Sequence, residues 1–295
     1  MKKIVIGSRG SDLALWQANF VKAELEKVGQ EVEIKIISTQ GDRVQDLSFD
    51  KMEGKGFFTK EIEAALLDKS IDLAVHSHKD LETTSPEGLK IAAVSSREDP
   101  SDVLLIRKGC SDTGMPLSLK RNAVVGTSSA RRKAQIIHLR DDVVIKDIRG
   151  NVPTRINKLK EGQFDAILLA LAGIKRLELD LSDFDVITLD PTFFVPAPAQ
   201  GVLGLQIREE DGLLAEILQN LNDQTVERRI NVERSVLKKL KGGCQMPLGV
   251  YCPNDKDIHV AFAKNWKSGA EFFHYQNDGS GEITTKIVED LLTKS

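Results

Sequence analysis

The chain lacks the features that mark several large classes of protein. No apolar run reaches about 18 residues, so the sequence predicts no transmembrane helix. No low-complexity tract interrupts its 295 residues, and 41% hydrophobic with 29% charged residues is ordinary for a globular protein. A net charge of −3 argues against a general nucleic-acid-binding protein, which would be basic over a whole domain. We therefore expect neither a nucleic-acid partner nor a membrane span.

Cysteine is scarce, and its spacing suggests no disulfide framework. Cys110, Cys244 and Cys252 form neither a CxxC pair nor an even set, which favours a reducing compartment. The apolar start at residues 1–7 looks like a secretory leader, but polar residues end it at once. We interpret it as the first strand of a cytoplasmic protein. GxxxxGK[ST] and dinucleotide fingerprints are also missing, so nucleotide cofactors are not expected.

Apolar runs alternate with helix-period segments through the first two thirds of the chain, and the pattern occurs twice. This order predicts an α/β fold with two doubly wound, mostly parallel sheets, each covered on both faces. The last part predicts a small α+β domain with a three-stranded antiparallel sheet. The predicted strands are 4–6, 32–38, 71–76, 91–94, 103–106, 123–125, 143–145, 166–169, 186–189, 201–207, 248–252, 258–264 and 271–275. The predicted helices are 12–28, 59–67, 129–139, 152–160, 226–240 and 281–292.

Two seams divide this pattern into domains. Because strand 201–207 could return to the first sheet, we expect a discontinuous domain 1 at residues 1–97 plus 199–219. Domain 2 is expected at 101–192 and a C-terminal domain at 222–295. The crossings at 95–101 and 192–199 would form a hinge.

Polar clusters follow several predicted strands, where α/β sheets bind their ligands. Gly126-Thr127-Ser128-Ser129 opens a helix, so its hydroxyl and N–H groups should face outward and form an anion site with the helix dipole. Nearby guanidiniums suit carboxylates or phosphates: Arg131, Arg132, Arg149 and Arg155. Each arginine could instead pair with an acidic residue on a solvated helix face. Their convergence on strand ends favours a polyanionic ligand, such as a polycarboxylate.

Asp80 follows the predicted strand 71–76 and lies next to Lys79. A carboxylate at a cleft mouth can transfer a proton or stabilise a nearby cation, although a helix cap or an ion pair with Lys79 is the alternative. His76 and His78 alternate as if on one strand face. Zinc needs a third ligand, which no HExxH motif or cysteine cluster supplies, so no metal site is expected.

Cys244 is a lone cysteine in the glycine-flanked segment 241–247, between a long charged helix and a strand. Gly242 and Gly243 would let a bulky group approach the sulfur. A structural cysteine is usually packed in a core, so this position favours a thiolate that carries a group, with a structural turn cysteine as the alternative. A protease-like nucleophile would need a base and an orienting partner, and no signature accompanies Cys244.

Seven segments, in order and with matching spacing, resemble the porphobilinogen deaminase (hydroxymethylbilane synthase) family over essentially the whole chain. They are residues 8–17, 54–61, 76–81, 126–132, 149–155, 200–201 and 242–245. The resemblance implies a transferase that joins four porphobilinogen molecules head to tail, releasing ammonia each time. Water then releases linear hydroxymethylbilane for tetrapyrrole (haem) biosynthesis. It also implies domains like type II periplasmic binding proteins and a monomer.

The resemblance also implies roles for individual residues. Cys244 would hold the dipyrromethane cofactor through a thioether, and Asp80 would contact pyrrole nitrogens and stabilise the cationic azafulvene formed as the amine leaves. Other cofactor contacts are implied for Lys79, Thr127, Ser128, Ser129, Arg131, Arg132 and Arg149. Substrate contacts are implied for Arg9, Ser11, Arg149, Arg155, Arg176 and Gln200. Lys51 and Lys55 correspond to a mobile lid.

Two departures from the family pattern concern the site and the hinge. His78 stands where relatives usually have methionine, beside Asp80. Pro198-Ala199-Gln200-Gly201 replaces the usual Val-Gly-Gln-Gly, which predicts a stiffer hinge. A non-catalytic anion-binding protein of the same two-lobed fold is the alternative function. It would need the arginines and the hinge, but neither Cys244 on its glycine loop nor Asp80.

Overall fold

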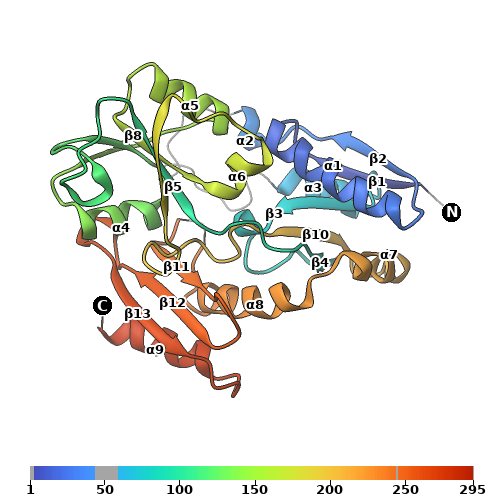
Figure 1. Ribbon diagram of the computed structural model, residues 1–295. Coiled ribbons are helices and arrows are strands. Elements are labelled where there is room, and N and C mark those ends of the chain that lie inside the picture. The colour runs from blue at the N-terminus through green and yellow to red at the C-terminus, as the bar shows by residue number, and fades with distance from the viewer. Residues whose placement is uncertain (1–2, 44–58, 244, 295) are drawn as a thin grey trace. The chain divides into compact units, whose positions relative to one another are not determined.

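The computed structural model describes residues 3–43, 59–243 and 245–294, and the chain divides into two compact units. Unit 1 contains residues 3–43, 59–98 and 200–228 of these. Unit 2 contains residues 99–199, 229–243 and 245–294. The chain therefore passes between the units after residues 98, 199 and 228, and Figure 1 follows its course by colour.

Unit 1 is built on a five-stranded sheet with the order β2-β1-β3-β10-β4. Its strands are β1 (Ile4–Ser8), β2 (Val32–Ile36), β3 (Leu73–Ser77), β4 (Leu89–Val94) and β10 (Leu203–Arg208). β1 pairs in parallel with β2 and β3, whereas β10 is antiparallel to β3 and β4. The prediction that residues 201–207 return to the first sheet is confirmed.

Strand alternation assigns the two faces of this sheet to different helices. Ile4 and Ile6 pack in one core with α1 (Asp12–Lys27) and α7 (Gly212–Leu218), while Val5 packs against the core of α3 (Lys60–Leu67). Successive side chains of a strand point to opposite faces, so the short apolar run fills both cores. The remaining helical pieces are α2 (Gln40–Arg43), η2 (His78–Asp80) and η4 (Gln219–Leu221).

Unit 2 contains a second five-stranded sheet with the order β7-β6-β8-β5-β9. Its strands are β5 (Asp102–Arg107), β6 (Val124–Gly126), β7 (Val144–Lys146), β8 (Ala166–Ala170) and β9 (Phe184–Leu189). β6 is parallel to β7 and β8, whereas β5 is antiparallel to β8 and β9. Helix α4 (Ala130–Leu139) packs on one face, and α5 (Val152–Lys160) with α6 (Leu171–Arg176) on the other. The short helix η3 (Pro116–Ser118) lies between β5 and β6 in the chain.

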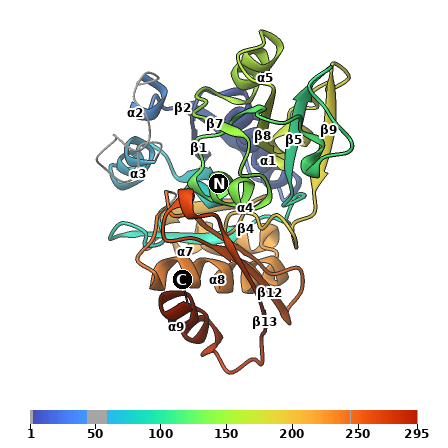
Figure 2. The same ribbon diagram turned by 90° about the vertical axis from the view of Figure 1, so that its left-hand side faces the viewer.

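The last part of the chain forms an antiparallel sheet of β11 (Leu248–Tyr251), β12 (Asp257–Phe262) and β13 (Glu271–Gln276). Helices α8 (Gln224–Lys239) and α9 (Ile283–Lys294) lie beside this sheet (Figure 2), and η5 (Trp266–Ser268) joins β12 to β13. Their shared core includes Val236, Val250, Val260 and Ile287, all fully buried. The three sheets confirm the predicted α/β fold class with its antiparallel C-terminal part. The expectation of mostly parallel sheets is wrong, because two of the four strand pairings in each five-stranded sheet are antiparallel.

Candidate active site

Asp80 lies on a short turn whose backbone is fixed on both sides. It closes η2, directly after β3. The N–H of His78 donates to Val202 O at 2.9 Å, and the N–H of Leu81 donates to His78 O at 3.2 Å. His78 is buried, whereas Asp80 is exposed. The turn therefore presents a carboxylate at the carboxyl end of a central strand, where ligands of α/β sheets bind.

Lys79 and Gln200 meet beside Asp80. Lys79 Nζ donates to Gln200 Oε1 at 3.3 Å, although 121 residues separate them in the chain. Gln200 is 1% exposed, and its carbonyl accepts a hydrogen bond from Arg97 Nε at 2.9 Å. The buried amide therefore fixes the lysine that precedes the candidate catalytic aspartate.

His76 belongs to a buried polar chain behind this turn. Its Nε2 lies 3.0 Å from Gln206 Oε1, and Gln206 Nε2 donates to Glu63 Oε1 at 3.2 Å. Burial lowers the pKa of His76 to about 4, against a weaker opposing effect of the Gln206 hydrogen bond. The ring is neutral at physiological pH and its role is structural.

The predicted strand face shared by His76 and His78 does not exist. β3 ends at Ser77, and His78 opens η2, so the strand alternation stops between the two rings. Among the residues that the structure describes, no group of three or more His, Cys, Asp or Glu side chains is arranged to hold a metal ion.

Arg9 and Ser11 follow β1, the parallel neighbour of β3. Ser8 is buried, and its Oγ bonds Arg9 O and Ala14 O at 3.1 Å each, which fixes the turn before α1. Ser11 is the N-cap residue of α1, but its hydroxyl makes no capping hydrogen bond. Arg9, Ser11 and Asp80 thus lie at the carboxyl ends of adjacent parallel strands.

The Thr127-Ser128-Ser129 segment of unit 2 differs from its prediction. Ser128 Oγ donates to Ile148 O at 2.8 Å and accepts from Ile148 N at 3.0 Å. Thr127 Oγ1 accepts from Ser129 N at 3.3 Å, and Ser129 Oγ caps α4 by accepting from Arg132 N at 3.5 Å. The hydroxyl groups expected to face outward therefore bond within the protein, because the adjoining backbone needs hydrogen-bond partners.

Arg131 and Arg132 converge on Asp102, the fully buried first residue of β5. Arg131 Nη1 lies 2.6 Å from Asp102 Oδ2, and Arg132 Nη2 lies 2.7 Å from Oδ1. Arg131 Nη1 also donates to Val195 O at 2.9 Å, and Arg132 Nη1 to Leu168 O at 2.9 Å. Burial alone would raise the pKa of Asp102, but the two guanidiniums outweigh it and hold that pKa well below its usual range.

Arg149 lies in the turn between β7 and α5, and Arg155 lies near the start of α5. Arg155 Nε donates to Gly150 O at 2.8 Å, and Asn151 Oδ1 caps α5 by accepting from Thr154 N at 2.9 Å. Burial lowers the pKa of the Arg149 guanidinium, and the charge of Asp147 opposes that effect. The parallel pairing of β6 with β7 brings this turn to the same sheet edge as Thr127. Arg176 is buried at the end of α6, which follows the neighbouring strand β8.

Cys244, Lys51 and Lys55 lie outside the described residues, so the roles predicted for them stay predictions. The neighbours of Cys244 are described. A Cβ added to Gly242 would meet Met246 Sδ at 2.6 Å, whereas nothing lies within 4 Å of one added to Gly243. A side chain at position 242 would therefore require the Met246 side chain to move, while none of the described residues lies close to a Cβ at position 243.

Asp102 was missed in the sequence, although it joins two predicted site residues. The sequence pattern that could have indicated Asp102 was weak, because it consisted only of an aspartate at the start of an apolar strand, two residues after Pro100. A buried aspartate is ion-paired in most proteins, but the sequence does not say with which arginine.

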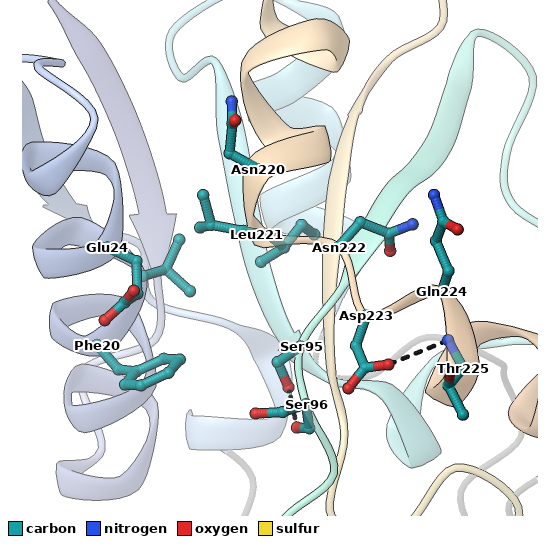
Figure 3. A pocket seen from close by; sticks show the side chains of 12 residues that line it. Phe20, Glu24, Ser95, Ser96, Asn220, Leu221, Asn222, Asp223, Gln224 and Thr225 are labelled. Carbon is teal, nitrogen blue, oxygen red and sulfur yellow. Dashed lines mark hydrogen bonds between the residues drawn. The ribbon is translucent and has the colours of Figure 1, made fainter.

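A separate pocket of about 510 Å³ lies within unit 1 (Figure 3). Its lining comes from α1, the segment after β4, β10 and the start of α8: Phe20, Val21, Glu24, Ser95, Ser96, Leu205 and residues 220–225. Asp223 Oδ1 accepts from Thr225 N at 3.0 Å (dashed in Figure 3), so this carboxylate caps α8. The lining includes none of the predicted site residues.

None of the helices within residues 3–43, 59–243 and 245–294 combines the length and the apolar character needed to cross a membrane. Neither Cys110 nor Cys252 forms a disulfide bond within the described residues.

Comparison with known proteins identifies the family. Residues 4–216 match the family model described as porphobilinogen deaminase, dipyrromethane cofactor binding domain, and residues 228–264 match the porphobilinogen deaminase C-terminal domain. A porphobilinogen deaminase of Nitratiruptor sp. is 44% identical over 291 residues, which cover 98% of this chain and 92% of that protein. One of Sulfurimonas denitrificans is 48% identical, over 100% of this chain and 98% of that protein.

A solved periplasmic binding protein of Salmonella typhimurium with arginine specificity also matches. It is 14% identical, covers 81% of this chain and 94% of that chain, and has a TM-score of 0.41, too low to carry an argument. The family models and the two curated relatives decide the assignment: the chain belongs to the porphobilinogen deaminase family.

Proposed function

We propose that this protein is a porphobilinogen deaminase, a transferase that condenses four porphobilinogen molecules head to tail into hydroxymethylbilane. Each condensation breaks the carbon–nitrogen bond of an aminomethyl group, releases ammonia and forms a carbon–carbon bond to the next pyrrole, which loses a proton. Water releases the finished product. The observation that carries the proposal is family membership over nearly the whole chain, including the dipyrromethane cofactor binding domain at residues 4–216.

Asp80 is the catalytic residue in this proposal. A positive charge develops on the substrate as the amine leaves, and a preorganised carboxylate stabilises such a charge. Its exposure supports this role, as does the turn that holds it through the backbone of His78 and Leu81. We also assign to this carboxylate the acceptance of the proton that the reacting pyrrole loses.

In unit 2, Arg131 keeps guanidinium donors that suit a cofactor rich in carboxylates. The dipyrromethane group, when bound through Cys244, supplies the pyrrole to which the first substrate is joined. Arg131 uses only Nη1 for its bonds to Asp102 and Val195, and its Nε and Nη2 make no hydrogen bond within the described residues. A planar guanidinium can bind the carboxylate of an acetate or propionate group through two parallel hydrogen bonds. We assign the remaining cofactor contacts to Lys79, Thr127, Ser128, Ser129, Arg132 and Arg149.

Substrate carboxylates would be bound at both sheet edges. The Ser11 hydroxyl, which α1 does not use as a cap, is available to a ligand of unit 1. In unit 2 the bond from Arg155 Nε to Gly150 O orients the guanidinium that we assign to the substrate. The complete proposed set is Arg9, Ser11, Arg149, Arg155, Arg176 and Gln200.

We further propose three domains, at 1–97 plus 199–219, 101–192 and 222–295. The separate hydrophobic core formed by α8, β11, β12 and α9 supports the third of these. We also propose a cytoplasmic monomer, and the lack of a disulfide at Cys110 and Cys252 in the described residues fits a reducing compartment.

Intact-mass measurement of the purified protein tests the function. The wild-type chain should weigh more than its sequence by one dipyrromethane group, and Cys244→Ser should remove this addition. Cys252→Ser is the matched control and should keep it. An unmodified wild-type protein that binds anions without consuming porphobilinogen would instead establish the binding-protein alternative.

A further inference from the structure

Lys133 is an almost fully buried cation on α4. It directly follows Arg131 and Arg132 in the chain, and it is only 5% exposed. Its Nζ lies 2.7 Å from Asp147 Oδ1 and 4.9 Å from the centre of the Trp266 ring. A buried ammonium needs such partners, because burial removes the water that stabilises its charge. All of these residues belong to unit 2, so the cluster lies within one compact part of the molecule.

Trp266 is held against α4 by the backbone of its own connection. It opens η5, between β12 and β13, and the N–H of Ala270, just after η5, donates to Ala134 O at 3.0 Å. Ala134 follows Lys133 on α4 and is fully buried. An aromatic ring face attracts an ammonium, and the attraction is stronger where water is excluded. The ring and the helix together therefore fix the place of the Lys133 ammonium.

Asp147 lies two residues before Arg149, in the segment that follows β7. Ile148 separates them and is 1% exposed, and both its N–H and its carbonyl bond Ser128 Oγ, at 3.0 and 2.8 Å. Burial lowers the pKa of the Arg149 guanidinium, and the nearby charge of Asp147 opposes that effect. Asp147 is thus a carboxylate within electrostatic reach of an arginine to which we assign the binding of carboxylates.

A carboxylate beside a ligand-binding guanidinium competes with the ligand for it. Arginine binds carboxylates through two parallel hydrogen bonds, and a carboxylate of the same chain is present at a high effective concentration. The side chain of Asp147 is 42% exposed, so packing alone leaves it room to turn, whereas the Lys133 side chain is only 7% exposed. The buried ammonium therefore decides the direction in which the Asp147 carboxylate points.

We propose that Lys133 is a positioning residue for Arg149: by binding Asp147, it keeps that carboxylate from bonding the guanidinium that takes up the carboxylates of the cofactor and the substrate. The proposal rests on the ligand-binding role proposed above for Arg149. It predicts that Asp147 weakens ligand binding once the ammonium is removed. A purely structural ion pair predicts a loss of stability with no change in ligand binding.

The test combines Lys133→Met, which removes the charge but keeps an unbranched side chain, with Asp147→Asn. In Lys133→Met, KM for porphobilinogen should rise by about fivefold, the factor that a partly exposed ion pair can supply, while kcat stays within about twofold. Adding Asp147→Asn should return KM to within about twofold of wild type, because a neutral amide competes weakly for a guanidinium. Lys160→Met is the matched control and should leave KM unchanged. Lys160 also pairs with an aspartate, Asp183 at 2.8 Å, and its Nζ lies 5.8 Å from the centre of the Phe184 ring.

A wild-type KM in Lys133→Met, or an increase that Asp147→Asn does not reverse, would overturn the proposal. If Lys133→Met does not fold, Trp266→Leu takes its place, because it removes the ring beside the ammonium and keeps both charges. KM should then rise by about twofold, and Asp147→Asn should again reverse the increase. An unchanged KM in Trp266→Leu would count against the proposal in the same way.

The proposed function and the role of Lys133 can fail separately. If the wild-type protein does not turn over porphobilinogen, the proposed function fails, and calorimetric binding of porphobilinogen, itself a dicarboxylate, replaces the kinetic measurement. A Kd that rises in Lys133→Met and returns with Asp147→Asn would still support the role of Lys133, whereas equal Kd values in all variants would overturn it.

Discussion

The charged residues at the carboxyl edges of the two five-stranded sheets differ in burial and in pairing. In unit 1, the charged residue Asp80 is exposed on a turn that buried neighbours support. In unit 2, Arg131 and Arg132 are only 5% and 6% exposed and share a buried carboxylate. The comparison teaches that a charged residue after a strand does not by itself present its charge to a ligand. The groups packed around it decide how much of the charge is used internally.

The difference has an energetic consequence. Removing an exposed carboxylate costs a protein little stability, so the effect of losing Asp80 should appear in catalysis. Removing one member of a buried ion-paired set leaves the other charges desolvated and uncompensated, so the effect should appear in folding. Four experiments test this contrast.

The largest effect is expected for Asp102→Asn. The change leaves the guanidiniums of Arg131 and Arg132 without their shared carboxylate, and the free energy of unfolding should fall by about 3–5 kcal/mol. Urea denaturation measures it. Asp183→Asn is the control, because Asp183 pairs with Lys160 at 2.8 Å but with side chains 66% and 46% exposed. That change should cost less than about 1 kcal/mol, and equal losses in the two variants would contradict the contrast.

Asp80→Asn should have the opposite profile. Turnover of porphobilinogen should fall by about 10²–10³-fold, since electrostatic stabilisation of the developing charge is lost. Stability to urea and the cofactor mass should stay as in wild type. Glu87→Gln removes another exposed carboxylate of the same unit and so controls for the loss of one negative charge. This variant should turn over porphobilinogen at the wild-type rate. A near-wild-type rate in Asp80→Asn would refute the catalytic assignment.

His76 makes the buried side of unit 1 sensitive to acid. Burial lowers its pKa from 6.5 to about 4, so below about pH 6.5 the unfolded chain binds a proton that the folded protein does not. This contribution to stability is complete above about pH 6.5 and is lost as the pH falls to about 4, by up to about 3 kcal/mol. Between pH 7 and pH 4.5, the free energy of unfolding should fall less in His76→Gln than in wild type, as urea denaturation at the two pH values would show. Parallel pH dependences would mean that His76 does not carry this effect.

The smallest effect concerns the glycine of the Arg149 turn. Gly150 has a φ of +113°, and a Cβ there would meet Thr154 Cγ2 at 2.5 Å. Gly109 has a φ of +81° with nothing within 4 Å of its Cβ position. Gly150→Ala should therefore destabilise the protein by about 1–3 kcal/mol and Gly109→Ala by about 1 kcal/mol, as thermal unfolding would show. Equal decreases in the melting temperature of the two variants would show that the Thr154 side chain moves aside without a loss of stability.

Much of the fold could be predicted because strands and long helices carry their own periodicity. The alternating and helix-spaced apolar residues located all thirteen strands of the described residues within a few positions, including β10, which returns to the first sheet. Helices α6 and α7 were missed, because six and seven residues are fewer than two full turns and show no clear period. His78 was placed on a strand because alternation continued in sequence after the strand had ended at Ser77.

The candidate site was predictable only in part. Asp80, Arg149 and Arg155 were selected as candidates by their position after predicted strands, which is a local property. The bonds that decide their surroundings join residues distant in the chain, such as Lys79 to Gln200 and Arg132 to Asp102. No spacing in the sequence encodes which of several acidic residues will be buried against a given arginine.

The amino-acid sequence by itself determined the family, the order of the strands and of the longer helices, and the residue types that can bind a polycarboxylate, because these depend on local pattern and on identity. Only the tertiary structure decided that the hydroxyls of Ser128 and Ser129 bond within the protein and that two arginines share Asp102. It also decided that the buried Lys133 pairs with Asp147. The physical reason is burial: packing removes water from polar groups, and each must then find a partner among whatever residues the fold brings within reach.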